Sequence, residues 1–322
     1  MGASPLFPPR YVDKETAREA LLHSLHQAPQ DSGHKRTRWT LQIFLATNAW
    51  LELHTLPGMC QLLQRLRIHW KRARHHVRSP DPDYVAKLHT IRINLLVPEL
   101  DWEQEVFLFQ DELTFYRHPS LFFAYEAAGK VQPLAEIGWK TNYSWRIAAS
   151  LNAWTGQVTY AQGKCFDIPH LVAFYQQVAE TYPTAQVIKM AQDNWPVHFH
   201  PDVLAALQPQ EWDWPLHVPA HWPTEASPGA QRLNLPIQIF PLPTYASWTN
   251  PAEKLWRLLK QELLHLHPFG DDWPGLKRAV TDFLDEFATG SSDLLRYVGL
   301  RDPTKLYRSL FPEEVVMPRL RC

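Results

Sequence analysis

Three acidic residues that lie far apart in the sequence are the strongest candidates for chemistry in this chain. Asp111 follows the apolar run 106–109, and Asp193 follows the apolar run 187–191. Glu253 lies in the first turn of an expected helix. Carboxylates brought close together repel, and a bound cation allows them to remain ionised together. Two divalent cations held in this way activate an attacking oxygen and stabilise a leaving one, so the three acids predict a metal site for phosphoryl transfer.

Each of these acids also has an ordinary structural explanation when it is taken alone. An aspartate at the end of a strand is commonly a turn residue. Glu253 follows Asn250-Pro251, where a cap, a proline and an acid near the helix dipole are all expected. The metal interpretation therefore depends on the three acids meeting at one place in the fold.

The sequence between the acids predicts a mixed α/β sheet that would position them. Short apolar runs predict five strands, and helical patterns follow the third, fourth and fifth of them. The predicted strands are 106–109, 146–151, 157–160, 187–191 and 237–240. Residues 152–156 predict a hairpin turn and 169–182 a helix. Open α/β sheets bind ligands at the carboxyl ends of their strands, so the first and fourth strands would deliver Asp111 and Asp193 to one edge.

A helical region precedes this sheet. Residues 14–27 predict one helix, and the apolar spacing from Trp39 to Ile68 predicts a helix-turn-helix with its connection at 54–58. The second helix of this pair, within 55–68, would be the one presented to a DNA major groove. Residues 79–83 read Ser-Pro-Asp-Pro-Asp, which is typical of a non-helical junction, and 84–96 predict a connecting helix.

The charge of this helical region favours a polyanionic partner. Glu52 is the only acid between His34 and Arg78, whereas nine lysines and arginines lie between the same two limits or at them. Such an imbalance is typical of a surface that binds phosphates, although a small helical hairpin with a solvated basic face is the alternative. The candidate DNA contacts are Arg36, Arg38, Arg65, Arg67, Lys71, Arg72 and Arg74.

These observations divide the chain of 322 residues into four parts. The divisions are an amino-terminal helix and linker (1–34), a helix-turn-helix domain with its connecting helix (35–98), a catalytic domain (99–290) and a tail (291–322). A Pro- and Trp-rich stretch at 208–235 predicts a long loop inserted in the catalytic domain.

Composition excludes several classes of protein. A hydrophobic content of 45% with 12% aromatic residues argues against disorder. No apolar run is long enough to span a membrane or to act as a signal peptide, so we expect a cytoplasmic location and no membrane partner. Cys60, Cys165 and Cys322 have no paired spacing, so neither a disulfide framework nor a zinc ribbon is predicted.

Four sequence blocks, found in order, resemble a known family. They are Asp-Glu-Leu-Thr-Phe-Tyr-Arg at 111–117, Leu-Asn-Ala-Trp-Thr-Gly-Gln-Val at 151–158, Asp-Asn-Trp-Pro-Val-His at 193–198, and Leu-Pro-Thr-Tyr-Ala-Ser-Trp-Thr-Asn-Pro-Ala-Glu at 242–253. With them, residues 35–288 resemble the DDE transposases of the mariner superfamily, in its bacterial insertion-sequence branch. The block that ends at Glu253 is the most specific.

This resemblance implies a fold, an activity and partners. The expected fold is α/β, a ribonuclease H-like catalytic domain with a mixed five-stranded sheet and flanking helices, preceded by a small all-α helix-turn-helix domain. The expected catalytic and metal-binding residues are Asp111, Asp193 and Glu253, with two Mg²⁺ or Mn²⁺ ions. The expected activity is cut-and-paste transposition on double-stranded DNA by a homodimer that binds terminal inverted repeats and target DNA, in a bacterial, nucleoid-associated setting.

Two departures from the family pattern are visible. The interval between Asp193 and Glu253 is longer than is usual, largely because of the Pro- and Trp-rich stretch. The amino-terminal part contains one clear helix-turn-helix where relatives often carry two. A specialised subgroup and a decayed copy are both compatible with these departures.

Side chains beside the three acids are candidates for support or substrate contact. These are Asn194, His198 and Lys260, where a structural histidine and a solvated lysine are the alternatives for the last two. Glu112 is expected to point to the opposite side of the strand from Asp111, and Trp256 is expected in the core.

Two other functions remain open on the residues alone. One is a catalytically silent, transposase-derived DNA-binding regulator, and the other is a metal-dependent nuclease or resolvase of the same fold. Inverted repeats flanking the gene would separate a mobile element from both.

Overall fold

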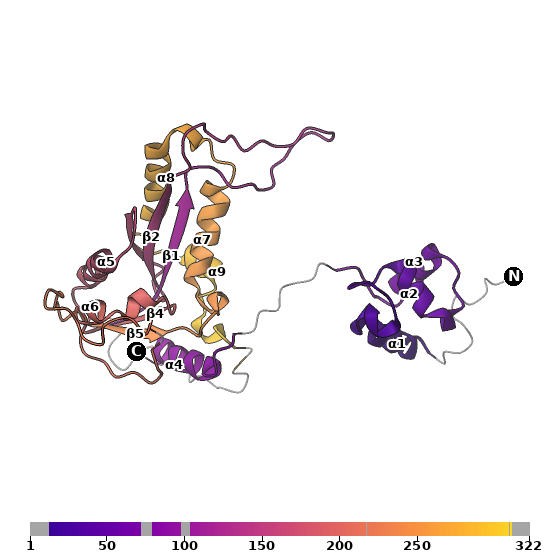
Figure 1. The fold of residues 1–322 in the computed structure, drawn as a ribbon, viewed down its shortest axis with the longest axis horizontal. Coiled ribbons are helices and arrows are strands. Elements are labelled where there is room, and N and C mark those ends of the chain that lie inside the picture. The colour runs from indigo at the N-terminus through magenta and orange to yellow at the C-terminus, as the bar shows by residue number, and fades with distance from the viewer. Residues whose placement is uncertain (1–12, 72–78, 98–103, 217, 309, 311–322) are drawn as a thin grey trace. The chain divides into compact units, whose positions relative to one another are not determined.

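The chain folds into two compact units, Met1–His76 and Val77–Cys322, which we call the helical unit and the sheet unit. The structure is a computed structural model that describes residues 13–71, 79–97, 104–216, 218–308 and 310 (Figure 1). The division falls before the boundary predicted at residue 98. The reason is that the connecting helix buries Leu88, Ile91 and Leu95 in the core of the sheet unit.

The helical unit contains three α-helices among its described residues. They are α1 (Lys14–His26), α2 (Leu41–Thr47) and α3 (Leu56–Arg65), with short 3₁₀ turns at Pro29–Ser32 and Ala49–Leu51. Thr40 and Thr55 cap α2 and α3, each accepting a hydrogen bond from a backbone N–H of the first turn. The connection between these helices therefore ends at Thr55, earlier than the predicted 54–58.

One apolar core joins all three helices of this unit. Leu21 of α1 packs with Phe44 of α2 and with Met59 and Leu62 of α3. The first helix is therefore part of the helical unit and is not a separate segment before residue 35.

The sheet unit is built on the mixed five-stranded sheet that the sequence predicts. The strand order is β3-β2-β1-β4-β5, in which β1 pairs antiparallel with β2 and parallel with β4, and β5 extends the parallel side. The strands are β1 (Glu105–Tyr116), β2 (Ser144–Asn152), β3 (Val158–Gly163), β4 (Val187–Gln192) and β5 (Ile237–Pro241).

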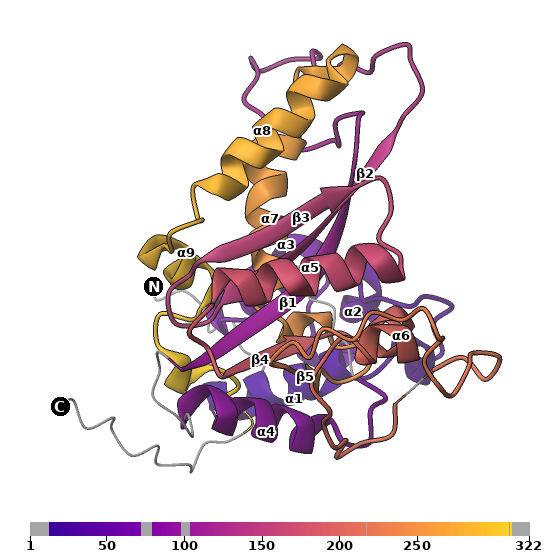
Figure 2. The same cartoon turned by 90° about the vertical axis from the view of Figure 1, so that its left-hand side faces the viewer.

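Helices cover both faces of this sheet. Their bounds are α4 (Tyr84–Leu96), α5 (Ile168–Thr181), α6 (Pro201–Leu204), α7 (Ala252–Leu259), α8 (Trp273–Asp285) and α9 (Ser292–Val298). Figure 1 shows α5 and α6 on one side and α7 and α9 on the other, and Figure 2 shows α5 lying across the strands. Side chains of β1 point alternately to the two faces of the sheet. Phe107 and Phe109 pack with α7, whereas Val106 and Leu108 pack with α5.

Two segments differ from the sequence prediction. Helix α9 lies in the region expected to be a tail, but Leu294, Leu295 and Val298 are buried in the main core of the sheet unit. Strand β1 continues to Tyr116, well past the predicted end at residue 109, because β2 pairs with it along this whole length. The inserted stretch 208–235 forms neither a helix nor a strand in its described residues, as predicted.

Candidate active site

Two of the three acids lie at equivalent positions relative to two neighbouring parallel strands. The ladder between β1 and β4 pairs Phe109 with Ala191, so Asp111 and Asp193 each lie two residues beyond the same pair. Asp193 follows the end of β4, as predicted. Asp111 lies within β1, because the antiparallel partner β2 carries this strand past the point where the parallel pairing stops.

The third acid is brought to the same place by the start of α7. The Asn250 side chain accepts a hydrogen bond from the Ala252 N–H at 3.0 Å and donates one to the Gln110 carbonyl at 2.8 Å. Asn250 therefore ties the beginning of α7 to β1 immediately beside Asp111. Glu253 follows in the first turn of this helix.

All three acids line one cleft of the sheet unit, with a volume of about 950 Å³. The segment from Leu242 to Trp248 also lines the cleft, as do Asn194 and Trp195. The triad is open, because the oxygen atoms of Asp111, Asp193 and Glu253 do not all approach within 4.8 Å of one another. The predicted residues are thus gathered at one cleft by three separate elements.

Asp111 is the most perturbed acid of the cleft. Burial raises the pKa of its carboxyl well above the usual range, and the negative charges of Glu253, Glu112 and Asp193 raise it further. Its Oδ2 accepts a hydrogen bond from Trp256 Nε1 at 3.0 Å, and both side chains are buried. From the sequence, Trp256 was expected only in the core. The sequence feature that could have indicated this contact is an indole N–H donor three residues after Glu253.

His198 joins the other side of the cleft through two acids. Its Nε2 lies 3.4 Å from Glu112 Oε1 and 3.3 Å from Asp193 Oδ1, and its Nδ1 lies 3.1 Å from the Tyr175 hydroxyl. Burial lowers the pKa of His198, but the charge of Glu112 and the contacts with Asp193 outweigh it and raise the pKa to about 9. The ring is therefore protonated at neutral pH and forms ion pairs with both carboxylates.

The same contacts keep Asp193 ionised. Burial acts to raise the pKa of Asp193, but the hydrogen bond and charge of His198, together with the Trp195 N–H, hold it below the usual range. Glu112 lies on the opposite face of β1 from Asp111, as predicted, and its carboxylate forms a group with Asp193 and His198 whose ligand atoms lie within 4.8 Å of one another.

Glu253 has cations on its own helix. Burial and the charge of Asp193 raise its pKa, while the charges of Lys260 and Arg257 act in the opposite direction. Lys260 and Arg257 are exposed and line a smaller pocket together with Glu253.

Asn194 has a structural contact. Its side-chain amide donates to the Leu242 carbonyl, which ties the residue after Asp193 to the segment 242–248 that lines the cleft.

The predicted DNA contacts of the helical unit are surface residues wherever the structure describes them. Arg36 and Arg38 precede α2, Arg65 ends α3, and Arg67 and Lys71 follow it. All five are exposed. Arg72 and Arg74 lie outside the described residues.

The donors of the cleft fit divalent cations. Mg²⁺ and Mn²⁺ prefer oxygen ligands, and the triad offers three carboxylates from separate elements. Burial, followed by the negative charges of Glu253, Glu112 and Asp193, raises the pKa of Asp111, and a bound divalent cation would offset those charges.

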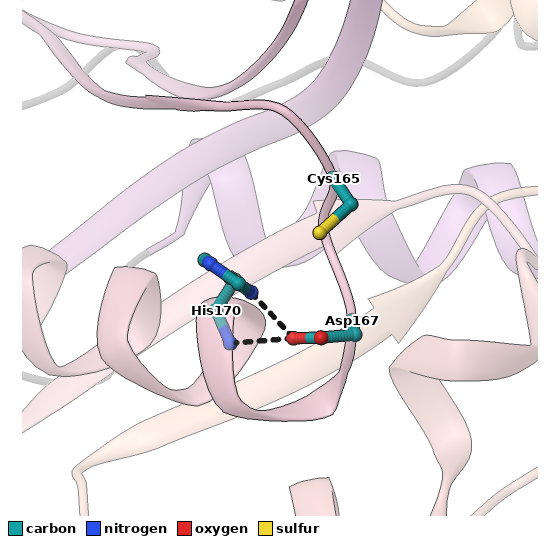
Figure 3. Close-up of side chains that lie close together, drawn as sticks. All are labelled: Cys165, Asp167 and His170. Atoms are coloured by element: carbon teal, nitrogen blue, oxygen red, sulfur yellow. Dashed lines mark hydrogen bonds and ion pairs between the residues drawn. The ribbon is translucent and has the colours of Figure 1, made fainter.

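Besides Glu112, Asp193 and His198, a second group of close metal-ligating side chains lies at the start of α5. Figure 3 shows Cys165, Asp167 and His170, all exposed, with their ligand atoms within 4.8 Å of one another. Asp167 accepts from the His170 backbone N–H at 3.2 Å and pairs with the His170 ring. These contacts are explained by capping of α5, so we assign no site here.

Comparison with known families decides the identity of this fold. Residues 106–272, which contain all three acids, match the family model described as DDE superfamily endonuclease. The chain belongs to this superfamily. No curated protein is significantly similar in sequence to the chain.

Solved structures of Mos1 transposase share its fold. The paired-end complex with left transposon end is 13% identical in sequence, with a TM-score of 0.61, and the match covers 97% of this chain and 81% of that one. The paired-end complex with Mn is 14% identical, with a TM-score of 0.60, and the match covers 97% of this chain and 81% of that one. The strand transfer complex is 14% identical, with a TM-score of 0.57, and the match covers 97% of this chain and 80% of that one. The ribonuclease H-like prediction for the sheet unit is therefore confirmed. In the part of the chain that the structure describes, no helix has the length and apolar character to cross a membrane.

Proposed function

We propose that this protein is a DNA transposase that cleaves and joins DNA strands at the ends of a mobile element, in the bacterial insertion-sequence branch of the mariner superfamily. The observation that carries the proposal is the convergence of Asp111, Asp193 and Glu253 on one cleft of a DDE superfamily fold. The double-stranded terminal repeats and the target DNA are its substrates, in a bacterial cytoplasm.

In this proposal the three acids hold two Mg²⁺ or Mn²⁺ ions through their carboxylate oxygens. Bound divalent cations supply the Lewis acidity that activates an attacking oxygen and offsets the charge of a leaving one. His198 keeps Asp193 ionised through its ion pair, and Trp256 holds one oxygen of Asp111. Asn250 fixes the distance of Glu253 from β1, so the chain itself preorganises all three ligands.

Metal binding can be tested without knowledge of the DNA substrate. Because a ligand that binds only the folded state stabilises it, Mn²⁺ should raise the Tm of the wild-type chain. Asp111→Asn should abolish this increase, since it removes one ligand charge. The same variant should be more stable than wild type without metal at neutral pH, because it removes a buried carboxylate whose pKa is raised. An equal Mn²⁺ response in both proteins would contradict the assignment.

The activity is tested on labelled DNA that carries the ends of the encoding element. Wild type with Mg²⁺ should yield both cleaved and joined products, and Asp193→Ala should lose both while retaining binding of the ends. Cleavage without joining would favour the nuclease alternative. Binding with neither product would favour the regulator.

We further propose that the helical unit binds the terminal repeats through α3 and its basic flanks. Arg65→Gln with Arg67→Gln should weaken binding and reduce the slope of log K against log salt by about 2, because each phosphate contact contributes about 0.9. Lys14→Gln, on α1 of the same unit, is the control. Unchanged salt dependence in the double variant would exclude these arginines from the contact surface.

A homodimer on DNA completes the proposal. The connection between β1 and β2 extends away from the sheet (Figure 1), and its Phe123, Tyr125 and Trp139 are each at least 85% exposed. Such apolar exposure is typical of a protein interaction surface. Sedimentation with end DNA should give two chains per complex for wild type and fewer for Phe123→Ser with Trp139→Ser.

A further inference from the structure

A second pocket adjoins the catalytic cleft and has a different chemistry. It has a volume of about 370 Å³ and shares Ser247, Trp248 and Glu253 with the cleft. We call it the basic–aromatic pocket, after its other lining residues. These are Phe122, Arg257, Lys260, Gln261 and His265.

The cations of this pocket project from one face of a helix. Arg257 and Lys260 lie four and seven residues after Glu253, which is the spacing of one helical side. Both are exposed, and among the described residues neither forms an ion pair with a carboxylate at 4.0 Å or less. Their charge is therefore available to an anionic ligand beside the catalytic acid.

The aromatic wall of the pocket is held in place by the backbone. Phe122 stacks on the His265 ring with a centroid distance of 4.3 Å and an interplanar angle of 2°. Ser120, two residues earlier, contacts His265 Nδ1 through its hydroxyl at 2.7 Å and accepts from the Leu266 N–H at 3.1 Å. The platform is therefore preformed.

Large aromatic surfaces of the pocket remain in contact with water. Phe122 is 48% exposed and Trp248 is 46% exposed. Helix α7 passes directly into the π-helical turn Lys260–Leu264, which places Lys260 and Gln261 at the rim, and such turns often occur at functional sites. Favourable helix dipole interactions explain basic residues near this helix end, but they do not explain a fixed, exposed aromatic platform beside them.

We propose that the basic–aromatic pocket binds one unpaired nucleotide of the DNA strand that enters the catalytic cleft. The base stacks on Phe122 or Trp248, and the neighbouring phosphates contact Arg257 and Lys260. Alternating cationic and aromatic groups are the general chemistry of single-strand binding, in which the base is held by its face without sequence readout. The inference rests on the proposed function, because it adds a substrate contact to that site.

The test compares two single-stranded probes on the full-length chain by fluorescence anisotropy, without metal. One is a labelled oligothymidylate, and the other is an abasic phosphodiester of the same length and charge. Because stacking contributes about 1–3 kcal/mol per base, wild type should bind oligothymidylate about 5- to 150-fold more tightly. Phe122→Ala with Trp248→Ala should reduce oligothymidylate binding to the abasic level and leave abasic binding unchanged.

The charged variants and the controls separate the two parts of the pocket. Arg257→Gln with Lys260→Gln should weaken both probes and lower the salt slope by about 1.4, since single strands give about 0.7 for each contact. Tyr116→Ala and Lys164→Gln, an exposed aromatic and an exposed cation outside the pocket, should change nothing.

Two results would overturn the inference. One is equal binding of both probes by wild type, and the other is an unchanged preference for oligothymidylate in the aromatic variant. Metal-dependent cleavage of duplex ends by the same wild-type preparation reports on the proposed function separately. Retained cleavage with either of these results therefore removes the nucleotide subsite and leaves the transposase proposal standing.

Discussion

Replacement of Trp256 by phenylalanine isolates one hydrogen bond of the site. The indole Nε1 donates to Asp111 Oδ2 at 3.0 Å, and the variant keeps an aromatic ring in the same core position. A hydrogen bond to a charged group contributes about 1.5–3 kcal/mol. Because this bond favours the ionised carboxylate, its loss should raise the pKa of Asp111 further above the range set by burial and by its acidic neighbours.

The assay is the pH dependence of Mn²⁺-dependent cleavage, together with Mn²⁺ binding measured by calorimetry. If losing the hydrogen bond changes only the proton affinity of Asp111, its free energy corresponds to a pKa increase of about 1–2 units. The acid limb of the rate profile should move to higher pH by the same amount. Binding of Mn²⁺ at pH 7 should weaken, because protons compete for Asp111. Above the limb the rate should recover, since the carboxylate is ionised again.

A control separates this effect from loss of packing. Leu259→Ala removes a buried side chain one turn further along α7 and should lower the free energy of unfolding by about 2–5 kcal/mol without moving the acid limb. If Trp256→Phe lowers the Tm but leaves both the acid limb and the Mn²⁺ affinity unchanged, Trp256 only packs, and the reasoning is refuted.

Two further predictions concern the frame of the site. Asp81→Asn leaves the buried Lys87 ammonium without the carboxylate that lies 2.8 Å away, and should cost about 3–5 kcal/mol of unfolding free energy at pH 7. Burial acts to raise the pKa of Asp81, but the hydrogen bond from Lys87 and others lower it, so in urea titrations this cost should shrink as pH falls through the lowered pKa. Gly156→Ala should cost about 2–5 kcal/mol, because φ is +72° and a Cβ would lie 2.4 Å from the Ser291 carbonyl oxygen. Gly229→Ala, with open space around it, should be neutral in the same thermal unfolding measurement, and equal costs would contradict this account.

Local sequence features predicted much of the secondary structure around the site. The turn at 152–156 forms between β2 and β3, where Asn152 Oδ1 accepts from the Trp154 and Thr155 N–H groups. Capping residues and apolar periodicity likewise placed α5 within one residue of its observed bounds. These features depend on neighbours in the chain, so they can be read without the fold.

Contacts between distant segments could not be predicted in the same way. The length of β1 is set by its partner β2, and α4 and α9 join the sheet unit because the apolar faces of both helices are buried there. Propensity carries no information about which partner covers an apolar face. For this reason the sequence predicted a domain boundary at residue 98 and a tail at residues 291–322.

The sequence by itself determined which acids can act, since Asp111, Asp193 and Glu253 are specified by residue type and by the blocks around them. Only the tertiary structure decided how their charges are balanced. Trp256 reaches Asp111 across 145 positions of sequence, whereas His198 reaches Glu112 only because a neighbouring parallel strand brings it to the other face of β1. Proton affinity depends on burial and on charges a few ångströms away, and these are properties of the packed chain.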